Sequence, residues 1–342
     1  AEKSIVIHKS SGRKANYGEL ATAAAAIPVP TDVKLKDIKD FKLIGTPVRN
    51  VDNHEMITGK PLYGLDFHRE GMLIAMVQRP TAFGMKIKSV DIAAAKAMPG
   101  IVDVVTFNNN VAVVGKSTWQ VMKARKALKV EYEKDGAIES TADHDRLFKE
   151  LLDSGNATVR RKDGDVDAAF KSAAKVIRSE YQCPFLSHAP LEPMNFFAHV
   201  REDGVELVGP TQTPDRARND TAKLLGISPD KITVEMTRLG GGFGRRLQSD
   251  YVIDAVEVSR AVKAPVKVVW TREDDMTAGI YRPAVRYRFE AALDAKGNMI
   301  GYKLRGVGIN AGNSTREDNF PSGAVDNLLI DSIDHQSPIT TG

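Results

Sequence analysis

The residues with the clearest capacity for chemistry form a glycine-rich loop, Arg238-Leu-Gly-Gly-Gly-Phe-Gly-Arg-Arg246. Each glycine costs about 1 kcal/mol of helix or strand propensity relative to alanine, but it permits positive φ and close approach of the backbone to a ligand. A strand-like pattern over 231–236 precedes the loop and a helical pattern over 249–262 follows it. Free backbone amides would then face a helix start, where anions bind. The two arginines favour a phosphate-bearing ligand, and a tight connection with solvated arginines is the alternative.

A second polar segment, Ser187-His-Ala-Pro-Leu-Glu-Pro193, contains a histidine and a carboxylate four residues apart. That spacing would suit two metal ligands on one helical face. Pro190 forbids a regular helix between His188 and Glu192, so the spacing rule does not apply. We therefore favour a structural role for His188.

Two more segments follow predicted strands. Gly209-Pro-Thr-Gln-Thr-Pro214 places Gln212 at a strand-to-helix corner, where its amide could face a cleft with one acceptor and two donors. A surface glutamine is the alternative. Trp270-Thr-Arg-Glu-Asp-Asp275, together with Tyr281-Arg-Pro283, carries charged and aromatic side chains. A solvated loop with local ion pairs is the simpler explanation for this last group.

The order of strand, glycine loop, helix and strand also allows a dinucleotide-binding interpretation. The fingerprint G-x-G-x-x-G is not matched, because Gly240, Gly242 and Gly244 give G-x-G-x-G and Arg245 occupies the place of the third glycine. The next acidic run, 273–275, lies about thirty residues after the first glycine, later than the expected distance of about twenty. A nicotinamide-dependent oxidoreductase stays as a minor alternative.

Composition narrows the class of protein. With 342 residues, 42% hydrophobic and 27% charged, the chain has material for two or three globular domains. A net charge of +4, without clustered Lys and Arg, argues against nucleic-acid binding. The single cysteine, Cys183, excludes an internal disulfide and a multi-cysteine metal or iron-sulfur site in this chain. No apolar run approaches the roughly 20 residues of a membrane span, so none is predicted.

The elements that must position these residues fall into four segments. We predict an N-terminal connector over 1–40, a compact α+β unit over 41–135, a polar linker over 136–164 with one helix near 145–152, and a second unit over 165–342. In the first unit, a helix over 118–128 would place Trp119 in the core. Residues 312–342 show no periodicity, so an extended or loosely ordered tail is expected.

The secondary structure of the larger units follows from periodicity and turn residues. Before the linker we expect strands over 72–78, 102–107 and 111–114 and a helix over 91–98. In the second unit we expect strands over 176–183, 195–200, 205–208 and 265–270, helices over 166–174 and 214–226, and a hairpin over 285–310 that turns at 294–297.

Taken together, these motifs resemble the large subunit of the xanthine oxidase and aldehyde oxidase family of molybdenum hydroxylases, most closely its isoquinoline 1-oxidoreductase β-subunit branch. The segments that carry the likeness are Tyr17-Gly-Glu-Leu20, Gly45-Thr-Pro-Val-Arg-Asn-Val-Asp52, Val111-Ala-Val-Val114, His188-Ala-Pro-Leu-Glu-Pro193, Thr211-Gln-Thr-Pro214, Gly240-Gly-Gly-Phe-Gly-Arg-Arg246 and Tyr281-Arg-Pro283. The resemblance implies an α+β fold, with an α/β-hammerhead domain over 41–135 followed by the first molybdenum-cofactor-binding domain, incomplete at its C-terminus, over 165–342.

The resemblance also implies roles for individual residues. Gln212 would hydrogen-bond the oxo ligand of molybdenum, so no residue of this chain would bind the metal directly. Gly241, Gly242, Phe243, Gly244 and Arg245 would line the cofactor, a molybdopterin that in bacteria commonly carries a cytosine dinucleotide.

The chemistry implied is hydroxylation, by a bacterial oxidoreductase, of a carbon next to a ring nitrogen or of an aldehyde carbon, with water as the oxygen source. Electrons would leave through [2Fe-2S] clusters on a separate small subunit. In the family, the glutamate that acts as general base lies in a Gly-x-Gly-Glu motif, and this sequence lacks that motif. We therefore expect no catalytic residue in this segment and no turnover without the remaining segments of the polypeptide. Leu247 stands where purine-oxidising members have a carboxylate, which disfavours purines. A non-catalytic binding or assembly module of the same fold is the alternative.

Overall fold

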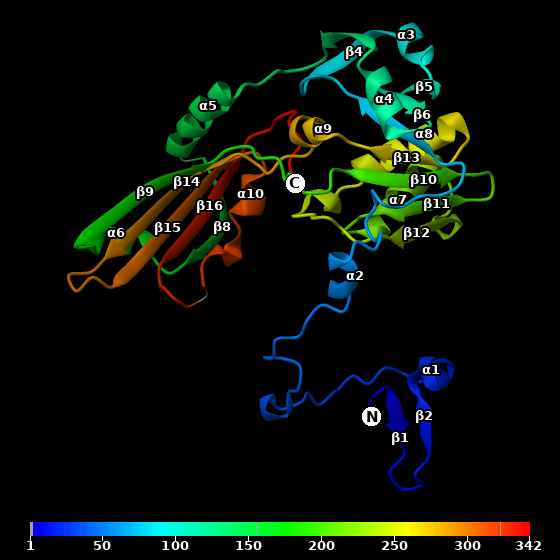
Figure 1. Cartoon of the computed structure of the whole chain (residues 1–342). Helices are drawn as coiled ribbons and strands as arrows, with labels where there is room; N and C mark the ends of the chain where they lie inside the picture. Colours follow the sequence, from blue (N-terminus) through cyan, green and yellow to red (C-terminus); the bar gives the residue numbers. More distant parts are fainter. Residues whose placement is uncertain (1–2, 155, 322) are drawn as a thin grey trace. The chain divides into compact units, whose positions relative to one another are not determined.

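A computed structural model describes residues 3–154, 156–321 and 323–342 (Figure 1). Its contacts divide the chain into two units, Ala1–Lys60 and Pro61–Gly342. The first unit contains a short hairpin followed by helical turns, and none of its described residues is buried. Its elements are β1 (Ile5–Ile7), β2 (Lys14–Asn16), α1 (Tyr17–Ala25), η1 (Ile38–Asp40) and α2 (Asn53–Ile57). Its helix α1 begins with a capping box between Asn16 and Glu19.

The second unit is built on a mixed sheet of seven strands. In spatial order they are β12 (Ile232–Met236), β11 (Val205–Gly209), β10 (Asn195–Val200), β13 (Val266–Val269), β3 (Leu73–Gln78), β6 (Asn110–Gly115) and β5 (Ile101–Phe107). The β11–β12 and β13–β3 pairs are parallel, and the other pairs are antiparallel. The sheet thus joins strands from both sides of the expected 136–164 linker, and the predicted domain boundaries stay a prediction.

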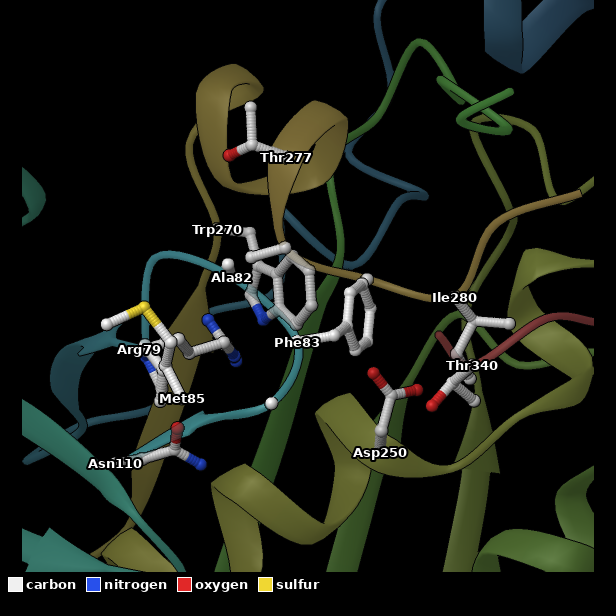
Figure 2. A pocket seen from close by; sticks show the side chains of 14 residues that line it. Arg79, Ala82, Phe83, Met85, Asn110, Asp250, Trp270, Thr277, Ile280 and Thr340 are labelled. Atoms are coloured by element: carbon white, nitrogen blue, oxygen red, sulfur yellow. The ribbon is translucent and has the colours of Figure 1, made fainter. Parts of the chain in front are cut away.

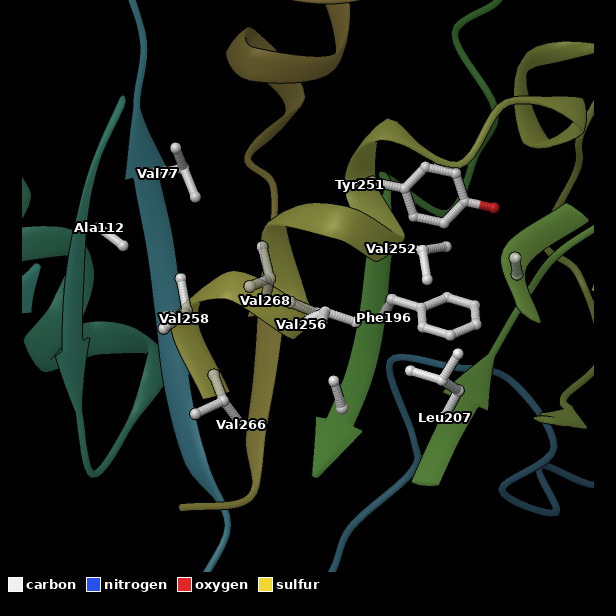
Figure 3. Packing of buried hydrophobic residues seen from close by; sticks show 14 of the residues in the cluster. Val77, Ala112, Phe196, Leu207, Tyr251, Val252, Val256, Val258, Val266 and Val268 are labelled. Carbon is white, nitrogen blue, oxygen red and sulfur yellow. The ribbon is translucent and has the colours of Figure 1, made fainter. Parts of the chain in front are cut away.

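The main core lies between this sheet and helix α8 (Asp250–Val262), which contacts β10 and β13. Figure 3 shows Val252 and Val256 of α8 directed toward Phe196 and Leu207 of the sheet. All four of these side chains are fully buried, and burying each contributes about 1.5–3 kcal/mol.

Two shorter helices contact the same sheet. α7 (Pro214–Leu225), which contacts β12, begins with proline at its first turn and ends at Gly226 with φ +67, as the sequence predicted. The other, α4 (Thr118–Arg125), contacts β3 and β6.

The predicted core position of Trp119 is wrong. Val121 and Ala124 are the buried residues of α4, while Trp119 is 63% exposed with the Lys123 ammonium 4.6 Å from its ring centre. The residues that face the sheet already fill that side of the helix. The indole therefore lies on the opposite side, which the helical period alone did not reveal.

A small antiparallel pair, β4 (Met85–Asp91) with β7 (Lys129–Lys134), completes this part of the chain together with α3 (Ala93–Lys96). The sequence did not predict these two strands, since both are charged and largely exposed.

A second sheet has five strands in the order β8 (Thr158–Asp163), β16 (Leu328–Asp334), β15 (Met299–Gly308), β14 (Val285–Leu293) and β9 (Lys175–Cys183). The β14–β15 hairpin is confirmed, with a tight turn at Asp294–Gly297. Helices α5 (Thr141–Ser154) and α6 (Val166–Ser172) both contact β15. The segment 136–164, expected as a linker, therefore contributes both α5 and the edge strand β8.

The extended or loosely ordered tail expected over 312–342 is extended in part, but it contains a regular strand of the five-stranded sheet. β16 is inserted between β15, to which it is parallel, and β8, to which it is antiparallel. Its sequence includes Asp331 and Ser332, and these polar residues conceal the apolar signature of a buried strand. Both are buried, and Asp331 accepts two hydrogen bonds from Arg305, at 2.8 and 2.7 Å. The rest of the tail includes α10 (Ala311–Ser314) and η4 (Glu317–Asn319).

The architecture is a mixed α+β fold, as predicted. Within the described ranges, no helix is long and apolar enough to cross a membrane.

Candidate functional site

The glycine loop leaves the edge strand β12 and turns sharply before α8. Three of its residues have positive φ, Gly241 (+101°), Phe243 (+53°) and Gly244 (+97°). Glycine tolerates this region, whereas phenylalanine adopts it at a cost. The Phe243 side chain is 63% exposed, and its carbonyl accepts a hydrogen bond of 2.9 Å from Nη2 of Arg282. This external contact helps to hold the strained residue in place.

The loop leaves backbone donors open. The N–H of Gly240 donates to Oε2 of Glu192 at 2.8 Å, and the N–H of Gly244 donates to Oε1 of Gln212 at 3.2 Å. Among the described residues, no acceptor is paired with the N–H groups of Gly241, Gly242 and Phe243. Successive unpaired amides in a turn form a concave site for anionic or partly negative oxygen atoms.

Gln212 lies directly against this loop. Its backbone N–H donates to the carbonyl of Arg246 at 3.0 Å, and a Cβ atom added to Gly242 would stand only 2.6 Å from its Oε1. The side chain is exposed, and within the described part of the chain its Nε2 donates to no acceptor. The structure therefore brings Gln212 and the 241–244 segment together, with one amide donor still available.

Arg246 acts inside the protein. Its side chain is fully buried and donates to the carbonyls of Gly241 (2.8 Å), Pro210 (3.3 Å) and Glu192 (2.8 Å), as well as to Oε2 of Glu192 at 3.3 Å. Burial lowers the pKa of the guanidinium, and the charge of Glu192 works in the opposite direction. The Arg246 guanidinium thereby connects the glycine loop to the segments that contain Pro210 and Glu192.

Arg245 is also buried, at 3% exposure, and forms a bidentate pair with Asp250 at 2.7 and 2.6 Å. Burial disfavours its charge, but the Asp250 carboxylate outweighs this and raises the pKa of Arg245. The guanidinium also lies 5.4 Å from the ring centre of Trp270. The alternative of solvated arginines is wrong, because Arg245 is buried against Asp250 and Arg246 is buried against Glu192 and three backbone carbonyls.

Glu192 is the residue of the site whose role the sequence missed. Its Oε1 accepts hydrogen bonds from the N–H of Leu65 and Nδ2 of Asn195, both at 3.0 Å, while Oε2 receives those of Gly240 and Arg246. With both oxygens saturated, this buried carboxylate fixes the loop and is not available as a metal ligand beside His188. In the sequence, the position of Glu192 between Pro190 and Pro193 was the only indication that it lies in a turn near the site.

His188 is half-buried beside the loop, where a Cβ atom on Gly244 would lie 3.7 Å from its Nε2. Burial lowers the pKa of this imidazole, and the positive charges of Arg282 and Arg245 lower it further. Its Nδ1 is buried without a partner among the described residues. The neutral ring therefore presents Nε2 toward the glycine turn.

The segment after β13 is more ordered than a solvated loop. Arg272 donates to the carbonyls of Pro190 (2.7 Å) and Leu191 (2.8 Å) and pairs with the buried Asp275 at 3.0 Å. Burial raises the pKa of Asp275, and the Arg272 charge opposes this. Helix α9 (Arg272–Thr277) thus holds the turn that contains His188.

A cavity of about 370 Å³ is lined in part by Asp250, the partner of Arg245 (Figure 2). Figure 2 shows Phe83, Ile280 and Asp250 around it, with Arg79 beside Trp270. The guanidinium of Arg79 is 3.9 Å from the Trp270 ring centre. The walls of the cavity come from residues within 79–85 and 270–280 and from Asn110, Asp250 and Thr340, so no single stretch of sequence gave a signal for it.

Comparison with known proteins identifies the family. A profile described as "Molybdopterin cofactor-binding domain" matches residues 149–329, more than half of the chain. The sequence is 33% identical to isoquinoline 1-oxidoreductase subunit beta of Brevundimonas diminuta, covering 87% of this chain and 44% of that protein. It is 34% identical to a membrane-bound aldehyde dehydrogenase [pyrroloquinoline-quinone] of Gluconacetobacter polyoxogenes, covering 76% of this chain and 35% of that protein.

Among solved structures, quinoline 2-oxidoreductase of Pseudomonas putida 86 aligns with a TM-score of 0.66 at 24% identity, over 78% of this chain and 40% of that one. This likeness concerns the fold. The chain thus spans less than half the length of these two relatives.

The nicotinamide alternative is wrong. Strand β13, which follows α8, is separated from β12 by β11 and β10, so the glycine loop does not join neighbouring parallel strands as in a dinucleotide fold. The family match instead covers the loop, Gln212 and His188 together. The chain belongs to the molybdopterin cofactor-binding domain family and forms part of the molybdopterin-binding subunit of a molybdenum hydroxylase-family oxidoreductase.

Proposed function

We propose that the whole protein hydroxylates an N-heteroaromatic compound or an aldehyde, and that this chain supplies one side of its cofactor site. The names of the two relatives, an isoquinoline oxidoreductase and an aldehyde dehydrogenase, support these two substrate classes. In this proposal residues 41–135 correspond to the hammerhead domain and 165–342 to the first cofactor-binding domain. The glutamate that acts as general base would come from segments outside the 342 residues.

The residues of the loop fit a molybdopterin. The observation that carries the proposal is a set of backbone N–H groups, at Gly241, Gly242 and Phe243, that have no acceptor among the residues the structure describes and lie beside the amide of Gln212. These donors suit the oxygen atoms of a molybdenum cofactor. A Cβ atom at 241 would stand 2.9 Å from the Phe243 ring and one at 242 would stand 2.6 Å from Oε1 of Gln212, so glycine at both positions keeps the turn and Gln212 in close contact. When bound, this cofactor supplies the two-electron oxidation chemistry, with water as the oxygen source.

Each residue of the chain then has a distinct task. Gln212 would hold the cofactor's oxo group through a hydrogen bond from Nε2, and the 241–244 backbone amides would hold its other oxygen atoms. Arg245 acts through Asp250, since both of its terminal nitrogens are occupied, and it keeps the loop rigid. His188 is half-buried beside Gly244 and forms part of the wall of the site.

Electron transfer requires another subunit. The only cysteine is Cys183, which cannot hold a [2Fe-2S] cluster by itself. We propose a small [2Fe-2S] subunit as the partner and a cytosine dinucleotide as the cofactor's tail. The donors of Arg245 and Arg246 are used within the protein, so the phosphates of such a tail would be bound by other groups.

The test is the Gln212→Ala substitution in the complete enzyme. We expect turnover to fall about 10²-fold with molybdenum content unchanged, because one preorganised donor is lost while the glycine loop still holds the cofactor. Turnover with quinoline-type and aldehyde substrates and elemental analysis for molybdenum are the two measurements. Gln182→Ala, on exposed strand β9, is the control and should leave both unchanged. Unaltered turnover in Gln212→Ala with full metal content would refute the assigned role.

A further inference from the structure

A cluster of possible metal ligands lies between α5 and the segment after β16. One ligand atom from each of Glu139, His144 and His335 falls within 4.8 Å of the other two. Nε2 of His144 is 2.7 Å from Oε2 of Glu139, and Nε2 of His335 is 3.4 Å from Oε1. The glycine loop and Gln212 contribute nothing to this cluster.

The spacing suits a small divalent ion. Zn²⁺ binds imidazole nitrogen and carboxylate oxygen at about 2.0–2.2 Å in tetrahedral geometry, which places neighbouring ligand atoms about 3.3 Å apart. The two imidazoles contact different oxygens of Glu139, Oε2 at 2.7 Å from His144 and Oε1 at 3.4 Å from His335, and one ligand atom from each of the three residues lies within 4.8 Å of the others. Small shifts of side chains would therefore bring all three groups onto one ion.

The environment favours a filled site over an ordinary surface cluster. His144 is 3% exposed, and its ring lies 5.5 Å from that of Phe148 and 5.3 Å from that of Phe185. Within the described residues its Nδ1 has no partner. The nitrogen that faces the cluster is Nε2, which lies 2.7 Å from Oε2 of Glu139, and the unpartnered Nδ1 costs free energy whether or not an ion is bound. An ion at Nε2 would add an attraction that is strong in these apolar surroundings.

The backbone and a neighbouring hydroxyl hold the ligands in position. The Ser337 hydroxyl donates to Glu139 at 2.5 Å and can orient the carboxylate as second-sphere groups do. The N–H of His335 donates to the carbonyl of Gly308 at 2.8 Å. His335 and Ser337 also line a cavity of about 410 Å³, which gives an ion a route to the site.

We propose that Glu139, His144 and His335 form a binding site for a divalent cation of the Zn²⁺ type, which fastens the segment after β16 to the start of α5. Water or the Ser337 hydroxyl would complete the coordination. The ligands are separated by up to 196 residues in sequence. The ion would therefore connect the start of α5, which precedes the first strand of the five-stranded sheet, to the residue that follows its last strand, β16.

The experiment is titration of the metal-free 342-residue protein with Zn²⁺ alone, followed by calorimetry and by thermal unfolding. We expect one ion per chain, micromolar or tighter affinity, and a rise of several degrees in Tm at saturation. Glu139→Gln and His335→Gln should each weaken binding by more than about tenfold. Co²⁺ should give the visible absorption of a tetrahedral site in the unmodified chain, and this absorption should be absent in Glu139→Gln and His335→Gln.

His68→Gln removes an exposed histidine outside the cluster and is the matched control, so its binding should equal that of the unmodified chain. Two results would overturn the proposal. One is the absence of stoichiometric Zn²⁺ binding by the folded chain, which would leave only a hydrogen-bonded clamp. The other is binding that Glu139→Gln and His335→Gln leave unchanged, which would place the ion on surface groups.

Discussion

The glycine loop and the Glu139–His144–His335 cluster both bury charged groups, but they use them in opposite ways. In the loop, the buried cations Arg245 and Arg246 are neutralised by fixed partners within the protein. In the cluster, a carboxylate and two imidazoles face one another, and one imidazole nitrogen is left without a partner among the described residues.

The buried side chains therefore serve different purposes in the two regions: in the loop they provide rigidity, and in the cluster they provide binding. Because the loop's side-chain charges are satisfied internally, backbone amides are what it offers to a ligand. In the cluster, the side chains themselves are the ligands. A pair of adjacent arginines can therefore mislead, because the sequence suggests a phosphate site whereas in the structure both guanidinium groups bind partners inside the protein.

The largest expected effect comes from Arg246, because this residue tests whether the loop depends on a cation neutralised inside the protein. Replacing this fully buried guanidinium by alanine should lower the free energy of unfolding by roughly 3–5 kcal/mol, because Glu192 and three carbonyls lose their cation. Urea unfolding of the two proteins measures this. Arg316→Ala, whose side chain is 62% exposed, should change it by less than about 0.5 kcal/mol. A loss below about 1 kcal/mol for Arg246→Ala would mean that the loop does not depend on its internal charge.

A smaller effect is expected from close packing of the loop. A Cβ atom at Gly240 would lie 2.4 Å from Cβ of Glu192, an atom too near the backbone to move freely. Gly240→Ala should therefore cost about 1–3 kcal/mol of stability through overpacking. Gly136→Ala meets nothing nearer than 3.8 Å and serves as the control in the same urea experiment. Equal stability of the two variants would contradict the packing argument.

The smallest effect concerns pH. The pKa of His188 is lowered in the folded protein by burial and by Arg282 and Arg245, so the unfolded chain binds a proton more readily. This contribution to stability is complete above the unfolded value of about 6.5 and is lost as pH falls through it. His188→Gln should flatten the decline in unfolding free energy between neutral pH and the acidic side of that value. Parallel pH profiles for the two proteins would show that the ring's environment has no such effect.

Local signals were enough to predict much of the fold. The helix 214–226 begins at a proline and ends at a glycine, and its observed bounds follow these residues. The β14–β15 hairpin follows from alternation and its turn. β16 escaped prediction because Asp331 is buried opposite Arg305, and that compensation depends on a strand 26 residues away. Periodicity reports the face of an element and does not report its partners.

The sequence by itself determined the glycine turn, the position of Gln212 at a strand-to-helix corner and the family to which the chain belongs, because these depend on local backbone preferences and short motifs. Only the tertiary structure decided that Arg245 and Arg246 point inward, that Glu192 organises the loop, and that Glu139 meets His335 across 196 residues. Such meetings depend on long-range packing and on the desolvation of charge, neither of which leaves a periodic trace along the chain.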